Sequence, residues 1–476
     1  MKSAFHISLC VVLSAVTFSP DPVSGLDTVQ AQAEAVASAV NPADKAGRQR
    51  RLQWNLDTLV GDYEQHGHHD AKWDSSARVA LETFARMRVT GTADEKLISD
   101  LGLAAKSAVT NGCDDPMIKY LYARFVPLPQ NHTSQDHAEL YRSAAEAMSQ
   151  SERPPIRKFY AALRAAESFN LGSASTLSEV HKWRGEAKRF LIAVANDKET
   201  PAGEVYDAWD ALLQSTPKNK VDHDDLYLAL DPLVFKNWPS DPSLLLLKGQ
   251  FYTDYAWEAR GSGFANAVSN QGWQLFATRL EIAEAALNKA WKLNPQDARI
   301  ARQMITVELG QGQGRPRMEQ WFQRAMSLDP NYYDACYAKL HYLQPKWYGS
   351  SEDMLEFGGE CVNSSKWGGH IPLILLDAHE LISAPLDREA RSKYFRRPEV
   401  WADLKQAFDK FFRFNPQETG WHHNYALYAY RAQQWVELNR ELQLLGPVNY
   451  DYFGGKAEFD KIVQAAKEHS VTPKSP

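Results

Sequence analysis

Hydrophobic residues recur three and four positions apart through residues 48–468, the spacing of helices that bury one face. Leu287 and Trp291 are a typical pair. Turn formers such as Asn111-Gly112 interrupt the pattern at intervals of roughly 12–20 residues. The alternation of apolar and polar residues that marks a strand is not found. The pattern predicts an all-α chain of short helices, arranged as a bundle or as a solenoid.

Three segments favour the solenoid because they share one pattern: ALNKAWKLNP at 286–295, WFQRAMSLDP at 321–330 and AFDKFFRFNP at 407–416. Each is predicted to be the end of an amphipathic helix, stopped by a proline. Superposed, they share two apolar positions, the first filled by Ala290, Ala325 and Phe411 and the second by Leu293, Leu328 and Phe414. The first two prolines are 35 residues apart, near the period of about 34 residues of stacked helical hairpins.

On this spacing, the region from 297 to 363 resembles two units of the tetratricopeptide-repeat superfamily. A helix at 297–309 would pair with one at 316–328, and a helix at 331–343 with one at 351–363. The resemblance implies an α-solenoid of antiparallel helical hairpins whose first helices line a concave groove. It implies a fold and no chemistry.

Residues 342–357 also resemble the signature of a bacterial family of unknown function that has tetratricopeptide-like helices. That family typically reads Leu-x-Pro-[Lys/Arg]-Trp-Gly-Gly-Ser, and this chain departs from it at Tyr348, where the family has glycine. The activity of that family is not established, so the resemblance again implies only a helical fold.

The same segment is expected to form a corner between two helices. Pro345 would end the first helix, Gly349 would allow a tight turn, and Ser350 would cap the next helix. We expect Trp347 to fill the corner, with a tryptophan that stacks on a ligand as the alternative.

Turn formers at Lys236–Pro242 mark a boundary between a less regular N-terminal helical half and the repeat region. The predicted division of the chain is 1–25 (signal peptide), 26–47 (mobile segment), 48–235 (N-terminal helical domain), 242–468 (repeat domain) and 469–476 (tail).

The signal peptide is predicted from an apolar run at residues 4–18 that follows Lys2. The run is shorter than the about 20 residues of a membrane-spanning helix, and no later stretch comes closer to that length. The protein is therefore predicted to be exported, to the periplasm or the medium. An uncleaved anchor or a buried first helix is the alternative, and the protein would be cytoplasmic if the segment is not a signal.

Three cysteines would remain after removal of this leader: Cys113, Cys336 and Cys361. An odd number allows at most one internal disulfide, for which Cys336 and Cys361 are the candidates. The alternative is three free thiols that pack as small apolar groups.

Composition narrows the choice of partner. The 476 residues include 53 Lys and Arg against 59 Asp and Glu, a formal net charge of −6. Mild acidity argues against nucleic acid as the partner, because nucleic-acid binders usually carry a basic surface. Aromatic residues make up 11% of the chain, including 14 tryptophans. The repeat pattern places most tryptophans between packed helices, which leaves tyrosine and histidine as the recognition candidates.

The sequence motifs predict no catalytic residue, no metal and no cofactor. Residues 66–70 (HGHHD) are of ligand type, but sequence neighbours cannot all reach one ion, so a polar loop is expected. His379-Glu380 begins an HExxH motif that Ser383 breaks. His422-His423 has no carboxylate or cysteine within reach along its own helix.

Surface recognition remains, on the predicted first helices of the hairpins. The apolar stripes of 331–343 and 421–433 leave two other faces, one with Asp334, Tyr337 and His341 and one with Asn424, Tyr428 and Arg431. These faces could also be ordinary exposed helix surface.

The sequence thus predicts a non-enzymatic helical-repeat protein that binds a protein or peptide partner on its concave face. One alternative is a hydrolase with a helical-toroid or bundle fold, whose aromatic residues would stack on a cell-envelope glycan. The other is a structural component of the cell envelope.

Overall fold

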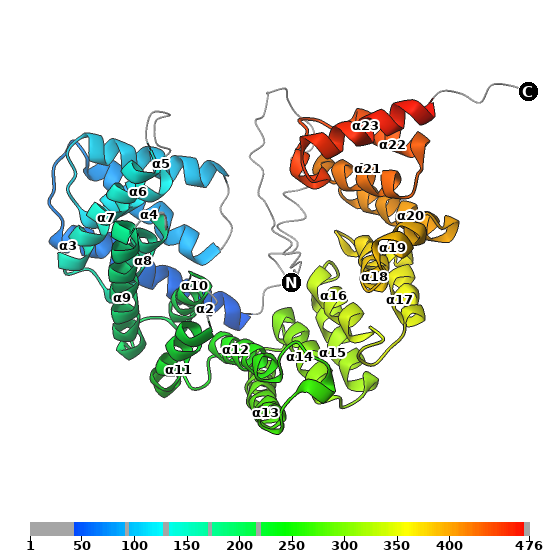
Figure 1. The fold of residues 1–476 in the computed structure, drawn as a ribbon. Helices are drawn as coiled ribbons and strands as arrows, with labels where there is room; N and C mark the ends of the chain where they lie inside the picture. Colours follow the sequence, from blue (N-terminus) through cyan, green and yellow to red (C-terminus); the bar gives the residue numbers. More distant parts are fainter. Residues whose placement is uncertain (1–41, 91–94, 127–132, 170–173, 216–219, 471–476) are drawn as a thin grey trace, which may run out of the picture.

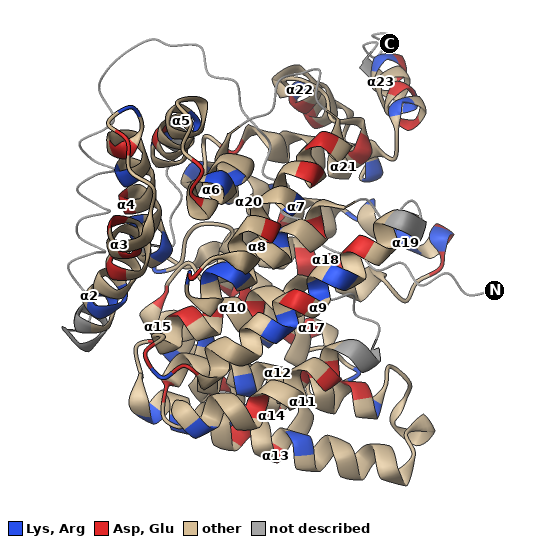
Figure 2. Cartoon of the chain, turned by 90° about the vertical axis from the view of Figure 1, so that its left-hand side faces the viewer, with Lys and Arg blue, Asp and Glu red and all other residues tan. Residues whose placement is uncertain are grey.

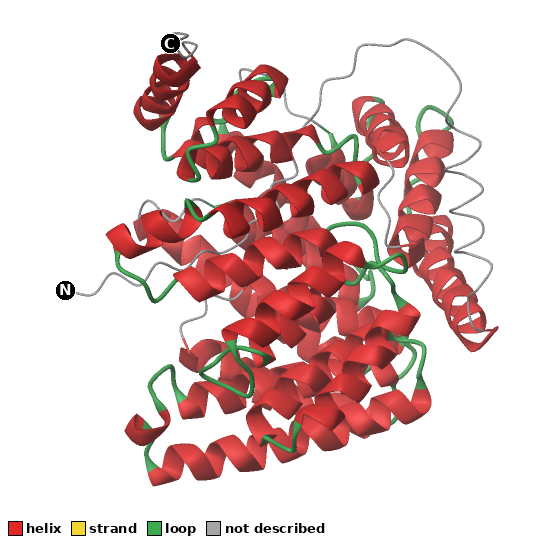
Figure 3. Ribbon diagram, turned by 90° about the vertical axis from the view of Figure 1, so that its right-hand side faces the viewer, coloured by secondary structure: helices red, strands yellow, loops and turns green. Residues whose placement is uncertain are grey.

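The computed structural model describes residues 42–90, 95–126, 133–169, 174–215 and 220–470 (Figure 1). Throughout these residues the chain is helix or connecting loop, and no strand occurs (Figure 3). The all-α prediction is confirmed. The predicted signal peptide, residues 26–41 and the last six residues lie outside the described part.

The N-terminal half is a series of helices in which each packs mainly on its neighbours in sequence. A short π-helical turn, Asp57–Gly61, joins the first two. The helices are α2 (Pro42–Leu56), α3 (Asp62–His66), α4 (Asp74–Thr90), α5 (Glu95–Thr110), α6 (Pro116–Phe125), α7 (Ser134–Gln150), α8 (Pro155–Ser168), α9 (Ala174–Asn196), α10 (Ala202–Ser215) and α11 (Lys220–Asn237). Because α2 begins at Pro42, a favoured first residue of a helix, the end of the segment predicted to be mobile is helical.

The second half continues as helical hairpins. Its helices are α12 (Pro242–Arg260), α13 (Asn270–Leu293), α14 (Ala298–Gln311), α15 (Arg315–Leu328), α16 (Tyr333–Tyr342), α17 (Ser351–Asn363), α18 (Ile374–Ser383), α19 (Arg388–Phe395), α20 (Pro398–Phe414), α21 (His422–Arg431), α22 (Trp435–Leu444) and α23 (Lys456–Ser470). The four helices expected from the repeat spacing are α14 to α17. Every one of their ends lies within two residues of its predicted position.

Two layers make the solenoid. The even-numbered helices α8, α10, α12, α14, α16 and α18 contact one another in succession, and the odd-numbered helices pack behind them. The described helices curve into an open arc, with α10, α12, α14 and α16 on its inner side and α11, α13, α15 and α17 on its outer side (Figure 1). Basic and acidic residues are interspersed along these helices, as Figure 2 shows for one side of the arc.

The boundary expected at Lys236–Pro242 is a turn, and Asp241 caps α12 by accepting hydrogen bonds from the backbone N–H groups of Ser243 and Leu244 at 3.0 Å. The hydrophobic core, however, divides one helix later. Leu244, Leu247 and Phe251 on α12 belong to the N-terminal core, whereas Leu245 and Leu246 on the same helix belong to the next one. Helix α12 is therefore shared by both halves.

The two apolar positions of the shared segments have different environments. Ala290, Ala325 and Phe411, at the first position, have no exposed surface. At the second position Leu293 and Phe414 are 48% and 42% exposed, and Leu328 is half-buried. Each second-position residue is the last of its helix, so the apolar pattern continues to a helix end that the core does not fully cover.

Cys113, Cys336 and Cys361 are buried free thiols, so the second of the two sequence alternatives holds. The Sγ atom of Cys336 lies 3.7 Å from Sδ of Met326. Burial raises the pKa of the Cys361 thiol, with the neighbouring Cys336 as a further cause. Among the described helices, none combines the length and the apolar character that a membrane span needs.

Candidate functional site

The inner helix α16 presents the first face predicted for recognition. Its apolar stripe of Cys336, Leu340 and Leu343 is fully buried against the outer layer. Because residues three positions apart share a helix face, Asp334 and Tyr337 lie together on the opposite side, where both are exposed, Tyr337 by 38%.

A second tyrosine connects this face to α18. Tyr333 lies one turn before Tyr337, and their rings stack with centroids 6.3 Å apart. The Tyr333 hydroxyl donates a hydrogen bond to the carboxylate of Asp377 on α18. Burial raises the pKa of Asp377 to about 7, and the negative charge of Glu380, one turn further on, adds to the shift.

Glu380 is the centre of the site. Its Oε1 atom accepts hydrogen bonds from the Tyr428 hydroxyl at 2.5 Å and from Arg431 Nη1 at 2.7 Å, and Oε2 accepts one from Arg391 of α19. Burial opposes ionisation of Glu380, but the charge of Arg431 and the hydrogen bonds outweigh it and lower its pKa. The Arg431 guanidinium also lies 4.0 Å from the ring centroid of Phe395.

The structure thus joins part of the two predicted faces through α18. Tyr337 stacks on Tyr333, whose hydroxyl binds Asp377 of α18. Tyr428 and Arg431 bind Glu380 of the same helix. Tyr428 is buried, with 8% exposure, so the prediction that it lies on a free face is wrong. Asn424 is half-buried on α21 and is not among the residues bonded to Glu380.

His341 does not join this cluster. Its Nε2 atom accepts a hydrogen bond from the indole N–H of Trp347 at 3.2 Å, and its Nδ1 atom lies 2.7 Å from Gln344 Nε2. Burial lowers the pKa of His341 to about 4, with the charge of Lys346 as a second cause. The histidine is therefore a neutral part of the α16–α17 corner.

The corner itself contains the predicted residues. Helix α16 ends at Tyr342, before Pro345, and the Ser350 hydroxyl accepts a hydrogen bond from the backbone N–H of Asp353 at 3.1 Å. A Cβ on Gly349 would lie 2.4 Å from the carbonyl oxygen of Leu343, so close backbone approach is what requires glycine there. Trp347 is half-buried and meets Trp257 of α12 edge-on at 5.3 Å.

Further tyrosine and arginine side chains continue along the inner layer toward the N-terminus. The Arg299 guanidinium of α14 lies 5.9 Å from the ring centroid of Tyr206 on α10 and is held by Asp297 at 2.7 Å. Burial raises the pKa of the Tyr332 hydroxyl, and the positive charges of Arg302 and Arg299 oppose this shift. We call the following residues the inner stripe: Tyr206, Arg299, Arg302, Tyr332, Tyr333, Asp334, Tyr337, Asp377, Glu380 and Arg431.

Three members of the Glu380 cluster were not found from the sequence: Tyr333, Asp377 and Arg391. Glu380 was considered only as part of an incomplete HExxH motif. The available signal was a pair of acids, three positions apart, on the mostly apolar helix Ile374–Ser383. Two carboxylates on one face of a helix that must be half-buried need partners from other elements.

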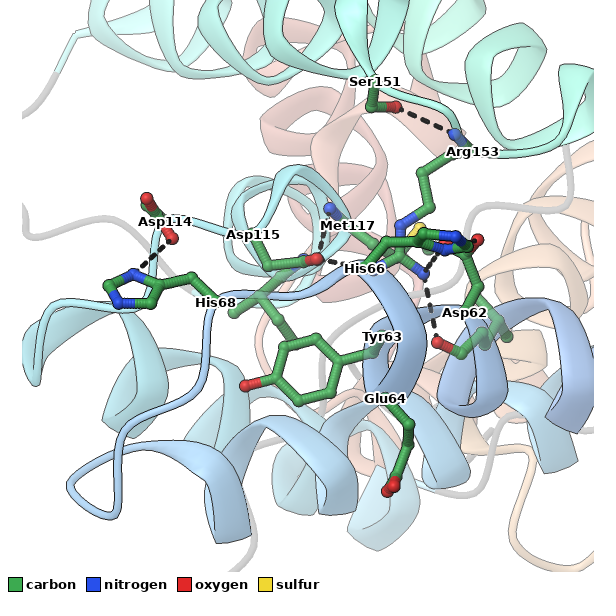
Figure 4. A network of polar contacts seen from close by, with 12 residues as sticks. Asp62, Tyr63, Glu64, His66, His68, Asp114, Asp115, Met117, Ser151 and Arg153 are labelled. Atoms are coloured by element: carbon green, nitrogen blue, oxygen red, sulfur yellow. Dashed lines mark hydrogen bonds and ion pairs between the residues drawn. The ribbon is translucent and has the colours of Figure 1, made fainter.

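The histidine-rich loop at 66–70 holds no common centre. Each histidine pairs with a different carboxylate, His66 with Asp62 at 3.1 Å, His68 with Asp114 at 3.7 Å and His69 with Asp74 at 3.2 Å. Beside the loop, buried Arg153 binds Asp62 at 2.7 Å and Asp115 at 2.5 Å (Figure 4). Within the described residues, no group of histidine, cysteine and acidic side chains is placed to hold a metal ion.

His422 has a partner that its own helix does not provide. Its Nδ1 atom lies 2.6 Å from Oε2 of Glu441 on α22, a carboxylate with no exposed surface. The imidazole also stacks on Phe412 at 4.2 Å, and Arg440 binds the other oxygen of Glu441 at 2.9 Å. Because Glu441 lies on the following helix, residue spacing within α21 could not reveal it.

The N-terminal half has its own buried ionic cluster. Glu204 on α10 has no exposed surface and accepts hydrogen bonds from Arg51 at 2.7 Å, Arg88 at 2.6 Å and Asn55 at 2.9 Å. Burial opposes ionisation, but the surrounding arginines outweigh it and lower the pKa of Glu204 to about 2. The cluster ties α2 and α4 to α10.

No protein-family model matches the chain, and no curated protein matches it in sequence. The class of the protein therefore follows from its own structure: an all-α solenoid of two helical layers with a polar stripe along the inner one.

The titration of Asp377 provides a test of the stripe's geometry. Since its pKa in the folded chain is about 7 and its ordinary value is 3.8, the folded chain binds this proton more tightly. The stability that the proton contributes is complete below about pH 4 and is lost as the pH rises through about 7. Between about pH 4 and 7 we expect the free energy of unfolding of the wild type to fall by about 1–2 kcal/mol more than that of Asp377→Asn. This is less than the whole pKa shift would give, because solvent reaches part of the site. Urea unfolding at several pH values measures the difference.

Asp334→Asn is the matched control, because Asp334 lies exposed on the same stripe. We expect it to keep the wild-type pH profile. His341 is present in all three proteins and cancels in the comparison. Parallel profiles for the wild type and Asp377→Asn would contradict the placement of Asp377.

Proposed function

We propose that the chain binds an extended segment of a protein partner along the inner stripe. One observation supports this most: tyrosine, arginine and acidic side chains lie in contact with one another on α10, α14, α16 and α18, four helices of the inner layer. Successive inner helices present side chains at regular steps, which suits a linear ligand.

The chemistry of the stripe favours a polypeptide. Tyrosine and arginine are the residues that contribute most to protein–protein binding, because each combines a large contact area with hydrogen bonding. The Glu380 cluster holds Arg431 in place before any partner arrives, which reduces the entropy lost on binding. Asp334 and Tyr337 are exposed and available for contact.

We also propose that the solenoid is a divergent member of the tetratricopeptide-repeat superfamily and that it acts outside the cytoplasm. The first proposal is supported by the helix spacing of α14 to α17. The second is supported by the apolar run at residues 4–18. N-terminal sequencing of the purified mature protein tests export, and an intact Met1 would contradict cleavage.

Selection from a displayed library of short linear peptides tests the binding function even though the partner is unidentified. We expect enriched peptides that bind the wild type and bind Tyr337→Ala and Asp334→Ala about tenfold more weakly, a loss of about 1.4 kcal/mol each. Fluorescence anisotropy of a labelled peptide measures the change.

Gln323→Ala is the control, since Gln323 is exposed on the outer helix α15. It should leave peptide affinity unchanged. Absence of enrichment, or equal affinity for the wild type and the two inner-stripe variants, would contradict the proposal. Arg431 is unsuitable as a first variant because its removal would also disturb Glu380.

A glycan hydrolase is the second candidate, and one observation favours it. Neighbouring carboxyl groups whose pKa values are moved apart are typical of acid–base catalysis, and the pKa of Asp377 is raised while that of Glu380 is lowered. Release of reducing sugars from purified cell-envelope glycan that Asp377→Asn abolishes would favour this function over peptide binding.

A further inference from the structure

The end of the α12–α13 hairpin has an unusual composition. The 18 residues from 261 to 278 (GSGFANAVSNQGWQLFAT) contain no charged side chain in a chain that is 24% charged. They form the loop after α12 and the first turns of α13, and Arg260 and Arg279 flank them. Figure 2 shows this end of α13 without acidic or basic residues, at the lower right of the view. We call residues 261–278 the hairpin tip.

Large apolar side chains are exposed on this tip. Phe264 is 85% exposed, Trp273 is 38% exposed and Leu275 is 37% exposed. Single exposed apolar residues are common on protein surfaces, but several at one uncharged end of a hairpin indicate a contact surface. Trp273 and Leu275 point to different sides of α13, so a partner would have to surround the tip rather than cover one face.

Cations gather at the base of the tip. The Arg260 guanidinium lies 5.1 to 5.6 Å from the ring centroids of Trp257, Trp273 and Trp347. Lys346 lies 5.9 Å from the ring centroid of Trp347. The tip therefore has an uncharged end with three exposed large apolar side chains among polar ones, and a base where aromatic rings and cations lie together.

This order of side chains matches the depth profile of a lipid bilayer. Tryptophan prefers the membrane–water interface, and arginine and lysine bind lipid phosphates. The nine helical residues from Asn270 to Thr278 rise by roughly 13 Å, comparable with the about 5–10 Å to which interfacial segments enter. A protein interface of ordinary size buries about 800 Å² on each partner, more than three side chains at a tip provide.

We propose that the hairpin tip inserts into the interface of a phospholipid membrane, with Arg260 and Lys346 at the depth of the phosphate groups. The solenoid would then be held on a membrane surface by this contact, and the inner stripe would remain free for its own partner. The inference does not depend on the function proposed for the stripe.

Vesicle flotation tests the insertion with the full chain and vesicles of phosphatidylcholine, alone or mixed with phosphatidylglycerol. We expect Phe264→Ser to lower the partition into both kinds of vesicle about tenfold, because most of the phenyl ring is available to enter lipid. Val436→Ser is the matched control, since Val436 is 88% exposed on α22, away from the tip, and should not change partition. All variants keep residues 1–41, so the difference between them reports the tip.

A second measurement reads insertion directly. Brominated lipid should quench tryptophan emission in the wild type, and Trp273→Phe should lose part of this quenching while its flotation is retained. Equal flotation of Phe264→Ser and the wild type, together with unchanged quenching in Trp273→Phe, would overturn the proposal. A change of oligomeric state in Phe264→Ser without a change in vesicle binding would also overturn it, in favour of a second copy as the occupant.

Discussion

Glu204→Gln is expected to lower the free energy of unfolding by about 3–5 kcal/mol, the range found when one partner of a buried ion pair is removed. Glu204 is fully buried and compensates Arg51 and Arg88 at 2.7 and 2.6 Å. Asp207 binds the same two arginines but is a third exposed, so it cannot replace the buried charge. Guanidinium unfolding, followed by circular dichroism, measures the loss.

The loss of free energy of unfolding in Glu204→Gln should become smaller as the pH falls. The pKa of Glu204 is lowered to about 2 from 4.5, so its contribution is present above about pH 4.5 and disappears as the pH falls through 2. The difference between wild type and variant should therefore shrink in acid. Glu199→Gln, an exposed acid in the turn before α10, is the control and should change stability by less than about 0.5 kcal/mol. An equal effect of the two substitutions would contradict the buried cluster.

Two adjacent glycines on α17 should respond with opposite sign to the same substitution. A Cβ on Gly358 would lie 2.9 Å from Cα of Leu375, at the contact between α17 and α18. We expect Gly358→Ala to lower the free energy of unfolding by about 2–3 kcal/mol, because the backbones must move apart. A Cβ on Gly359 meets nothing within 4 Å, and Gly359→Ala should stabilise by about 0.5–1 kcal/mol through helix propensity.

Thermal unfolding of the two variants side by side measures the contrast, and each serves as the control of the other. A Gly358→Ala variant that is as stable as the wild type would show that α17 and α18 do not approach as closely as the structure has them. A destabilised Gly359→Ala variant would show that the space beside Gly359 is not open. Because α17 packs on α18, which carries Asp377 and Glu380, loosening at Gly358 should also weaken peptide binding at the inner stripe.

Local patterns predicted the fold well where the determinants lie close together in sequence. The helices α14 to α17 follow from apolar spacing, caps and prolines within each segment, and their boundaries were found to within two residues. The exposure of Asp334 and Tyr337 follows from the same spacing. The periodicity was less informative at helix ends such as Leu293, where the pattern continues and the packing does not.

The candidate site could be predicted only in part because its centre is supplied by distant residues. Tyr428 and Arg431 turn inward to bind Glu380, which lies 48 and 51 positions earlier in the chain. His341 is likewise not free on the face of α16, because it accepts a hydrogen bond from the indole N–H of Trp347. The apolar spacing within one helix shows which of its positions face the core. It carries no information about a buried carboxylate on another helix to which a tyrosine or an arginine can bind.

Helix α12 sets a limit on how this protein can be divided. Its Leu244, Leu247 and Phe251 complete the first core while Leu245 and Leu246 complete the second. A fragment that stops at the turn before Pro242 would lack three core side chains, and the complementary fragment would expose them to solvent. Two independently soluble fragments would therefore both need residues 242–260. The arc cannot be divided into separable modules at the turn before Pro242, although the turn formers of the sequence are clustered there.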